Sequence, residues 1–225
     1  MKRTIAATVV CVALALLWGC DCHTEGVTGT TPAGSGVLVT ESRPVQGFTA
    51  VVVSGAGHVI IEQTGVESLQ VTAEDDIMPF VSTEVRGGRL FLGFEPGVSV
   101  SPTRGVEYRV SVAELTEIEA AGASRVEILH VDTPELTARL VGASIYTAAG
   151  IATDHTLELI GASRCDAGDL ASLTVTAHLS GASYGLVRAR DRLVVRASGA
   201  STLEYIGNPV VDATVSGASV VRSRG

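Results

Sequence analysis

A serine between glycines is the first candidate for chemistry in this 225-residue chain. Gly181-Ala182-Ser183-Tyr184-Gly185 matches the G-x-S-x-G pattern of a nucleophile elbow. That motif works only on a strand-to-helix turn, where a histidine and an acid reach the serine hydroxyl. Here Gly-Ala-Ser recurs along the chain and no helical segment follows it, so Ser183 is predicted to be a structural turn residue.

Carboxylates and histidines are the other side chains that could act as catalysts or metal ligands. Glu74-Asp75-Asp76 is the only dense acidic cluster. It lacks the spacing of an EF-hand, so a solvated turn is predicted, with a divalent-cation site as the alternative. Glu158 and His178 form the best candidate for a catalytic pair. No metal-ligand spacing is found among His58, His130, His155 and His178, and we expect neither a metal nor a cofactor.

Cysteine chemistry is predicted at the N-terminus. Met1-Lys2-Arg3 precedes an uncharged apolar run, and the Leu17-Trp18-Gly19-Cys20 that ends it resembles a bacterial lipobox. The motif implies cleavage before Cys20 and lipidation of its thiol, so residues 1–19 are expected to be a lipoprotein signal peptide. Residues 20–36, rich in Gly, Thr and Ser, are expected to be a flexible tether. An uncleaved anchor and simple secretion are the alternatives.

Two further cysteines would remain in the mature chain, Cys22 in the tether and Cys165 at a core position. A buried free thiol is predicted for Cys165, because cysteine commonly behaves as a small buried apolar residue. A Cys22–Cys165 disulfide is the alternative.

An internal repeat positions the candidate residues. Successive glycines of Gly-Ala-Ser are 20, 19, 20, 18 and 18 residues apart. Glycine would supply a turn conformation forbidden to other residues, and alanine would fit a crowded corner. Serine would hydrogen-bond the backbone of its own turn or of the neighbouring rung. The six predicted structural turns are Gly122-Ala123-Ser124, Gly142-Ala143-Ser144, Gly161-Ala162-Ser163, Gly181-Ala182-Ser183, Gly199-Ala200-Ser201 and Gly217-Ala218-Ser219.

Apolar and polar residues alternate on both sides of each glycine, which is typical of strands with one face in a core. Each unit is therefore strand, tight turn, strand and return loop, with no room for a helix. A unit this small cannot bury its own apolar face, so the units must stack. The polar residues three places before the glycines form an outward ladder predicted to stabilise the strand register, namely Glu119, Arg139, Glu158, His178, Arg196 and Thr214.

These motifs resemble those of the putative auto-transporter adhesin, head GIN domain family (DUF2807) of bacterial envelopes. The resemblance covers roughly residues 48 to 225, through the repeated Gly-Ala-Ser and the approach Phe48-Thr49-Ala50-Val51-Val52-Val53-Ser54-Gly55-Ala56-Gly57. It implies a β-helix of the pectin-lyase-like sort and a role in adhesion, and it offers no catalytic residues. The expected fold is all-β, a right-handed parallel β-helix with rungs of about 19 residues.

The regular rungs are expected over residues 113–225, after an irregular N-terminal β region over residues 37–112. Ser54-Gly55-Ala56-Gly57 resembles a degenerate first turn, and Gly87-Gly88 predicts a hairpin. Whether residues 37–112 belong to the β-helix or form a separate cap stays open. The final edge carries Arg222 and Arg224. Either these charges prevent edge-to-edge pairing, or another chain covers the edge.

Composition narrows the function. The net charge of −8 argues against nucleic acid and against electrostatic binding to anionic lipids. Aromatic residues are few, which weakens a lectin reading, although Tyr146 and Tyr184 could occupy an exposed side. A left-handed acyltransferase helix is disfavoured, because its hexapeptide coils need spacings in multiples of six.

The predicted function is therefore a non-enzymatic, lipid-anchored lipoprotein of the bacterial cell envelope, exported to the outer membrane or the periplasmic face. Its β-helix would act as an adhesin-like or scaffold module. Expected partners are the membrane through the lipid anchor, an envelope or extracellular ligand, and a second copy in a homo-oligomer. A polysaccharide-active enzyme of the pectin-lyase-like type is the alternative, and it would need carboxylates gathered on one sheet face.

Overall fold

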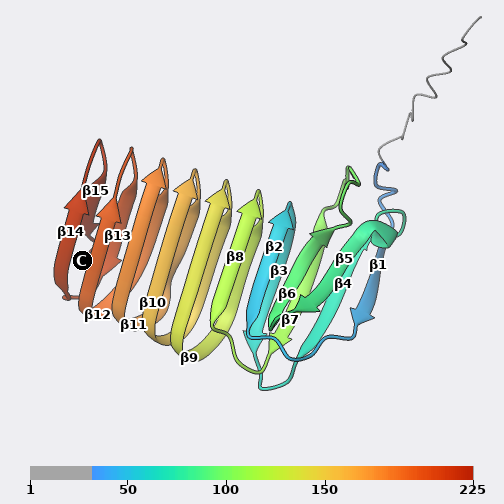
Figure 1. The fold of residues 1–225 in the computed structure, drawn as a ribbon, viewed down its shortest axis with the longest axis horizontal. Coiled ribbons are helices and arrows are strands. Elements are labelled where there is room, and N and C mark those ends of the chain that lie inside the picture. The colour runs from blue at the N-terminus through green and yellow to red at the C-terminus, as the bar shows by residue number, and fades with distance from the viewer. Residues whose placement is uncertain (1–31, 225) are drawn as a thin grey trace, which may run out of the picture. The chain divides into compact units, whose positions relative to one another are not determined.

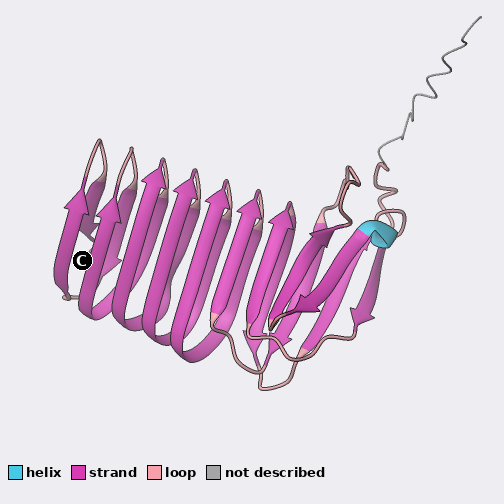
Figure 2. Ribbon diagram, in the orientation of Figure 1, coloured by secondary structure: helices cyan, strands magenta, loops and turns pink. Residues whose placement is uncertain are grey.

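The computed structural model describes residues 32–224, which are built almost entirely from strands (Figures 1 and 2). One 3-10 turn, η1 (Met78–Phe80), interrupts them. The strands are β1 (Leu38–Arg43), β2 (Ala50–Gly55), β3 (Gly57–Gln63), β4 (Ser68–Glu74), β5 (Val81–Arg86), β6 (Arg89–Phe94), β7 (Val106–Val112), β8 (Glu117–Gly122), β9 (Arg125–Gly142), β10 (Ile145–Gly161), β11 (Arg164–Gly181), β12 (Tyr184–Ala197), β13 (Thr202–Ile206), β14 (Val210–Val215) and β15 (Val220–Ser223).

The rungs stack in register through parallel pairing, as Figure 1 shows from β8 to β15. Strands that lead into a Gly-Ala-Ser turn form one face, here called the entry face, which β2 and β6 extend by parallel pairing. It consists of β6, β2, β8, the second halves of β9 to β12, and β14. Strands that leave the turn form the exit face, which β3 and β7 extend in the same way. It consists of β7, β3, the first halves of β9 to β12, β13 and β15. The predicted all-β parallel β-helix is confirmed.

The core lies between the two faces and follows the period-two alternation. On the entry face, Leu157 and Leu159 are buried, whereas Glu158 between them points outward. On the exit face, Tyr146, Cys165 and Val187 are each 0% exposed. Each rung therefore buries its apolar residues only together with its neighbours, as expected of a solenoid.

The return side of the rungs differs from the expected loop. β9, β10 and β11 continue as strands around the bend, over 17 or 18 residues each. Register shifts mark this side, for example between Ala148 and Gly150 and between Ala167 and Ala171. The predicted return loop is thus wrong for these rungs, because backbone ladders continue through the bend and bulges absorb the differences in rung length.

The N-terminal region stacks out of chain order. β2 pairs with both β6 and β8, and β3 pairs with both β7 and β9, so the rung that comes first in the chain lies between two later ones. Gly55 pairs with Gly122 in the same register as the repeated glycines. Beyond β6 and β7 the pairing becomes antiparallel, with β5 on β6, and β4 and then β1 on β7. The expected irregular N-terminal β part is confirmed.

Candidate functional site

Each Gly-Ala-Ser glycine meets two constraints at once. The φ angles of the six glycines lie between +70° and +94°, a region that favours glycine. A Cβ on any of them would lie 2.5 to 2.8 Å from the carbonyl oxygen of the glycine one rung earlier. That carbonyl instead accepts a backbone hydrogen bond of 2.7 to 2.9 Å from the alanine of the next turn. The backbone ladder therefore continues through the turn.

The serines of the first five turns are buried and bonded to the backbone, Ser183 included. In five of the turns the serine Oγ lies 2.8 to 3.2 Å from the carbonyl three residues earlier, and 3.2 to 3.4 Å from the preceding rung's glycine carbonyl. Ser183 is 2% exposed and contacts the Ser180 and Gly161 carbonyls in this way. Among the described residues the hydroxyl hydrogen-bonds to these two carbonyls and to no histidine or carboxylate, which is the geometry of a structural turn.

The alanines of the turns do not occupy a crowded corner. Ala123, Ala143 and Ala162 are exposed, whereas the following serines are buried. The expectation for alanine is wrong because the turn directs its second residue outward and its third residue inward. Packing against the core therefore does not limit the size of the residue at this place.

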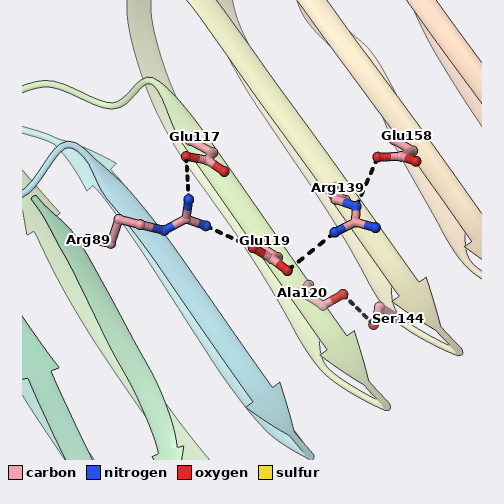
Figure 3. A network of polar contacts seen from close by, with 7 residues as sticks. All are labelled: Arg89, Glu117, Glu119, Ala120, Arg139, Ser144 and Glu158. Carbon is pink, nitrogen blue, oxygen red and sulfur yellow. Dashed lines mark hydrogen bonds and ion pairs between the residues drawn. The ribbon is translucent and has the colours of Figure 1, made fainter. Parts of the chain in front are cut away.

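The outward ladder of the entry face forms an ion-pair network (Figure 3). Arg139 Nε lies 2.9 Å from Glu158 and its Nη1 lies 3.7 Å from Glu119. Arg89 on β6 reaches across β2 to Glu117 at 3.1 Å and Glu119 at 2.8 Å. The pattern of the repeat indicated Glu119, Arg139 and Glu158. It could not indicate Arg89, which is brought in by the out-of-order stacking.

Glu158 and His178, the candidate catalytic pair, are neighbours in register on β10 and β11. Glu158 is paired with Arg139, and within residues 32–224 no ion pair joins it to His178. The two residues line a groove of about 380 Å³ in which Glu158 is the only acidic residue. A glycoside hydrolase needs two carboxyl groups across the scissile bond, and the lining of this groove supplies one.

Within the acidic cluster, Glu74 is buried at the end of β4, whereas Asp75 is exposed and Asp76 half-buried in the turn that follows. Glu74 is 0% exposed and accepts hydrogen bonds from the Gly36 amide at 2.7 Å, the Thr103 amide at 2.8 Å and the Thr103 hydroxyl. The Thr103 hydroxyl contact is the main cause that lowers the pKa of Glu74. Asp76 accepts the Ser35 amide at 3.0 Å. The predicted solvated turn holds for Asp75 and Asp76 but is wrong for Glu74, because amides from two other segments surround its carboxylate.

Tyr146, His155 and Cys165 are buried polar side chains in the interior of the stack. Tyr146 and His155 are buried with ring centroids 6.4 Å apart, and within residues 32–224 neither Tyr146 Oη nor His155 Nε2 has a hydrogen-bond partner. Burial lowers the pKa of His155 to about 4 and raises that of Tyr146. Cys165 is a buried free thiol, as predicted, and burial raises its pKa. The expected exposed position of Tyr146 is wrong, whereas Tyr184 is half-buried.

A second groove, of about 470 Å³, lies on the return side of β10, β11 and β12. Its lining is mostly apolar and includes Ile151, which is 54% exposed, and Leu173. Arg188 and Arg190 also line it; Arg188 donates to the Gly168 carbonyl at 2.7 Å and Arg190 pairs with Asp191. This groove forms where the rungs bulge on the return side. In the sequence, only the uneven spacing of the repeat indicates such bulges.

Cys20, the predicted signal peptide and residues 20–31 of the predicted tether lie outside the described residues. Between residues 32 and 224 the structure contains no group of three or more side chains suited to a metal ion. None of its helices is long and apolar enough to cross a bilayer.

Comparison with known proteins points to one family. The model described as putative auto-transporter adhesin, head GIN domain, matches residues 47–209. No curated protein matches the chain.

Solved structures share the fold. A putative adhesin from Bacteroides fragilis is 19% identical with a TM-score of 0.67, covering 85% of this chain and 98% of its own. A putative adhesin from Parabacteroides merdae is 16% identical with a TM-score of 0.56, covering 86% and 98%. A putative lipid binding protein from Parabacteroides distasonis is 16% identical with a TM-score of 0.54, covering 86% and 99%.

Proposed function

The chain belongs to the putative auto-transporter adhesin, head GIN domain family, and from that premise we propose a non-enzymatic, lipid-anchored adhesin-like or scaffold protein of the cell envelope. The observation that carries the proposal is that each candidate catalytic group is held in a structural contact. Ser183 bonds turn carbonyls, Glu158 pairs with Arg139, and Glu74 binds backbone amides. What the fold offers outward is a repetitive surface for binding.

The ends of the stack suit a tethered binding module. Ala33 forms a parallel bridge with Ser101, and the Gly34 amide donates to the Ser101 carbonyl at 3.0 Å. The chain therefore enters the folded region beside the N-terminal strands. Eleven residues lie between Cys20 and Pro32, a reach of at most about 40 Å when extended. A lipid at Cys20 would therefore keep the folded region close to the membrane surface.

Protease shaving of intact cells tests this function. Cells would express the wild type, Cys20→Ala, or the control Cys22→Ala, with metabolic lipid labelling in parallel. We expect labelling of the wild type and of the Cys22→Ala control, no labelling of Cys20→Ala, and cleavage of the labelled protein by external protease. Surface-exposed protein would then be tested for adherence of the expressing cells.

Two results would contradict the proposal in different ways. Equal labelling of wild type and Cys20→Ala would remove the lipid anchor. A labelled protein that is protected from external protease would remove the adhesin role and leave a scaffold inside the envelope. Hydrolysis of a polysaccharide panel by the purified wild type, lost in the Glu158→Gln variant, would support the enzymatic alternative instead.

A further inference from the structure

The last rung of the described stack exposes residues that belong to the core. Val211 and Val215 continue the inward rows of Leu193 and Ala197 in register. They are 39% and 42% exposed, whereas Leu193 is 0% and Ala197 is 3% exposed. Within residues 32–224, β14 pairs along one edge only, with β12, and β15 along one edge only, with β13. This end therefore offers apolar side chains together with two strand edges.

The opposite end of the stack is closed. Ile77 at 0%, Met78 at 3% and Val81 at 3% exposure cover the core beside β4 and β5. The outermost strands there carry short-range ion pairs, Glu41 with Arg43 at 2.7 Å on β1 and Glu84 with Arg86 at 3.3 Å on β5. Charged edge strands resist further pairing. One open and one closed end favour a closed two-fold contact over a growing fibre.

We propose that a second copy of this chain covers the last rung, through a two-fold axis that pairs β14 of each copy with β15 of the other. β14 runs toward the turn at Gly217 and β15 runs away from it, so exchanging the two faces makes the new pairs antiparallel. Both strand edges gain partners, and Val211, Val215 and Val221 of each copy become covered.

Charge complementarity favours this two-fold axis over the one that would pair each strand with its own copy. Residues at equal distance from the turn come to face each other, which places Asp212 opposite the partner's Arg224 and diagonal to the partner's Arg222. Asp212 makes no ion pair within residues 32–224, and there the side chains of Arg222 and Arg224, 63% and 53% exposed, form ion pairs only with Glu204. The other two-fold axis would pair β15 with itself and set arginines against arginines, a destabilising arrangement.

The N-terminal segments would leave such a dimer at its two far ends. Pro32 and Ala33 contact Ser101 beside the closed end, on the side of the stack away from β14 and β15. The dimer itself does not depend on the proposed adhesin function.

Charge reversal in the full chain tests the contact. The protein would be purified in detergent and its mass measured by density-matched sedimentation between about 1 and 100 µM. The set comprises the wild type, Asp212→Arg, the double variant Arg222→Glu/Arg224→Glu, an equimolar mixture of these two, and Asp132→Arg. Asp132 is exposed in the middle of the stack. Asp132→Arg therefore changes the charge by the same amount as Asp212→Arg, but away from the last rung.

The expected result is a wild-type dimer that Asp132→Arg leaves unchanged. Asp212→Arg and the double arginine variant should each raise the dimer dissociation constant about tenfold or more. Their mixture should restore the dimer, because each reversed charge meets its opposite on the other chain. Monomeric wild type over the whole range, a dimer that Asp212→Arg does not weaken, a mixture that fails to recover, or growth into fibres would each overturn the proposal.

Discussion

At the scale of single residues, the turn glycine is the position under the tightest constraint. Gly161 has φ of +92° and lies against the Gly142 carbonyl of the rung before it. Gly65 has a similar φ of +83°, but a Cβ there would meet nothing within 4 Å. Comparing Gly65 with Gly161 therefore distinguishes the effect of a positive φ alone from the added effect of close contact between rungs.

Replacing these two glycines by alanine should give unequal losses of stability. Gly65→Ala should lower the free energy of unfolding by about 1 kcal/mol, through the positive φ alone. Gly161→Ala should lower it by about 3 kcal/mol, because its Cβ would lie 2.8 Å from the Gly142 carbonyl oxygen and must displace it. Urea denaturation of both variants checks this. Equal losses would mean that the rungs can separate slightly without penalty.

Two buried tyrosines provide a second matched pair. Within residues 32–224 Tyr146 Oη has no hydrogen-bond partner, whereas Tyr108 Oη donates to the Gly93 carbonyl at 3.3 Å. Tyr146→Phe should raise the free energy of unfolding by about 1 kcal/mol, and Tyr108→Phe should lower it by about 1 kcal/mol. Thermal and urea unfolding measure both. A loss of stability in Tyr146→Phe would indicate a buried water on its hydroxyl.

Buried His155 should make stability depend on pH. Burial lowers the pKa of its imidazole to about 4, below the value of about 6.5 of an unfolded histidine. Between these two pKa values the unfolded chain binds a proton that the folded chain does not. The contribution of His155 to the free energy of unfolding is therefore fully present above pH 6.5 and is lost as the pH falls toward 4. That difference is worth about 3 kcal/mol.

His155→Leu should flatten the stability profile across this pH window. Leucine suits the site because Leu136 and Val175 are its register neighbours and both are buried. Urea unfolding at pH 7, 6, 5 and 4 compares the variant with the wild type. Parallel profiles for the two proteins would contradict the assignment.

At the scale of elements, the ion pairs of the entry face link strands that are not all consecutive in the sequence. Arg139 joins β9 to β8 and β10, and Arg89 joins β6 to β8 across β2. These side chains are partly exposed, Arg139 at 45% and Glu158 at 41%. Exposed pairs of this kind contribute little each and are screened by salt. The ladder should therefore favour one register more than it raises stability.

Arg139→Gln should lower the free energy of unfolding by less than about 1 kcal/mol at low salt and by almost nothing in 1 M NaCl. Arg192 is a matched control on the same face, because it makes no ion pair among the described residues. Arg192→Gln should be neutral at both salt concentrations. Urea unfolding at the two salt concentrations measures the effect, and a salt-independent loss would assign Arg139 a packing role instead.

At the scale of the whole molecule, the strands of each regular rung pair only with those of its two neighbours. Gly161 and Gly181 lie in register on adjacent rungs, so deleting residues 162–181 joins equivalent points of the stack. Stability in such folds is close to a sum over units and their interfaces. A whole rung should thus be removable, whereas part of one should not.

The 162–181 deletion should fold cooperatively, with a lower melting temperature and a urea m-value about a tenth smaller. Deleting only residues 162–171 should prevent folding, because the remaining chain could not alternate between the two faces. Circular dichroism with urea titration distinguishes the two outcomes. Unfolded protein from the whole-rung deletion would show that particular side chains, rather than the repeat, hold the rungs together.

Much of the rung could be predicted from its residues. The inward places of Leu157 and Leu159, the outward place of Glu158 and the turn at Gly161 all follow from local alternation and spacing. The exposed turn alanines were missed, because spacing does not tell which residue of a turn points inward. The burial of Glu74 was missed as well, because the amides of Gly36 and Thr103 that surround it come from distant segments.

By itself, the sequence determined the rung and the parallel stacking, since strand periodicity and positive-φ turns are local properties and short units must share a core. Only the tertiary structure decided which rungs are neighbours in the N-terminal region, where β2 and β3 insert between later strands. That insertion brings Arg89 to Glu119 and leaves one end closed and the other open. Rung order there depends on long-range pairing between segments of unequal length, which no local pattern records.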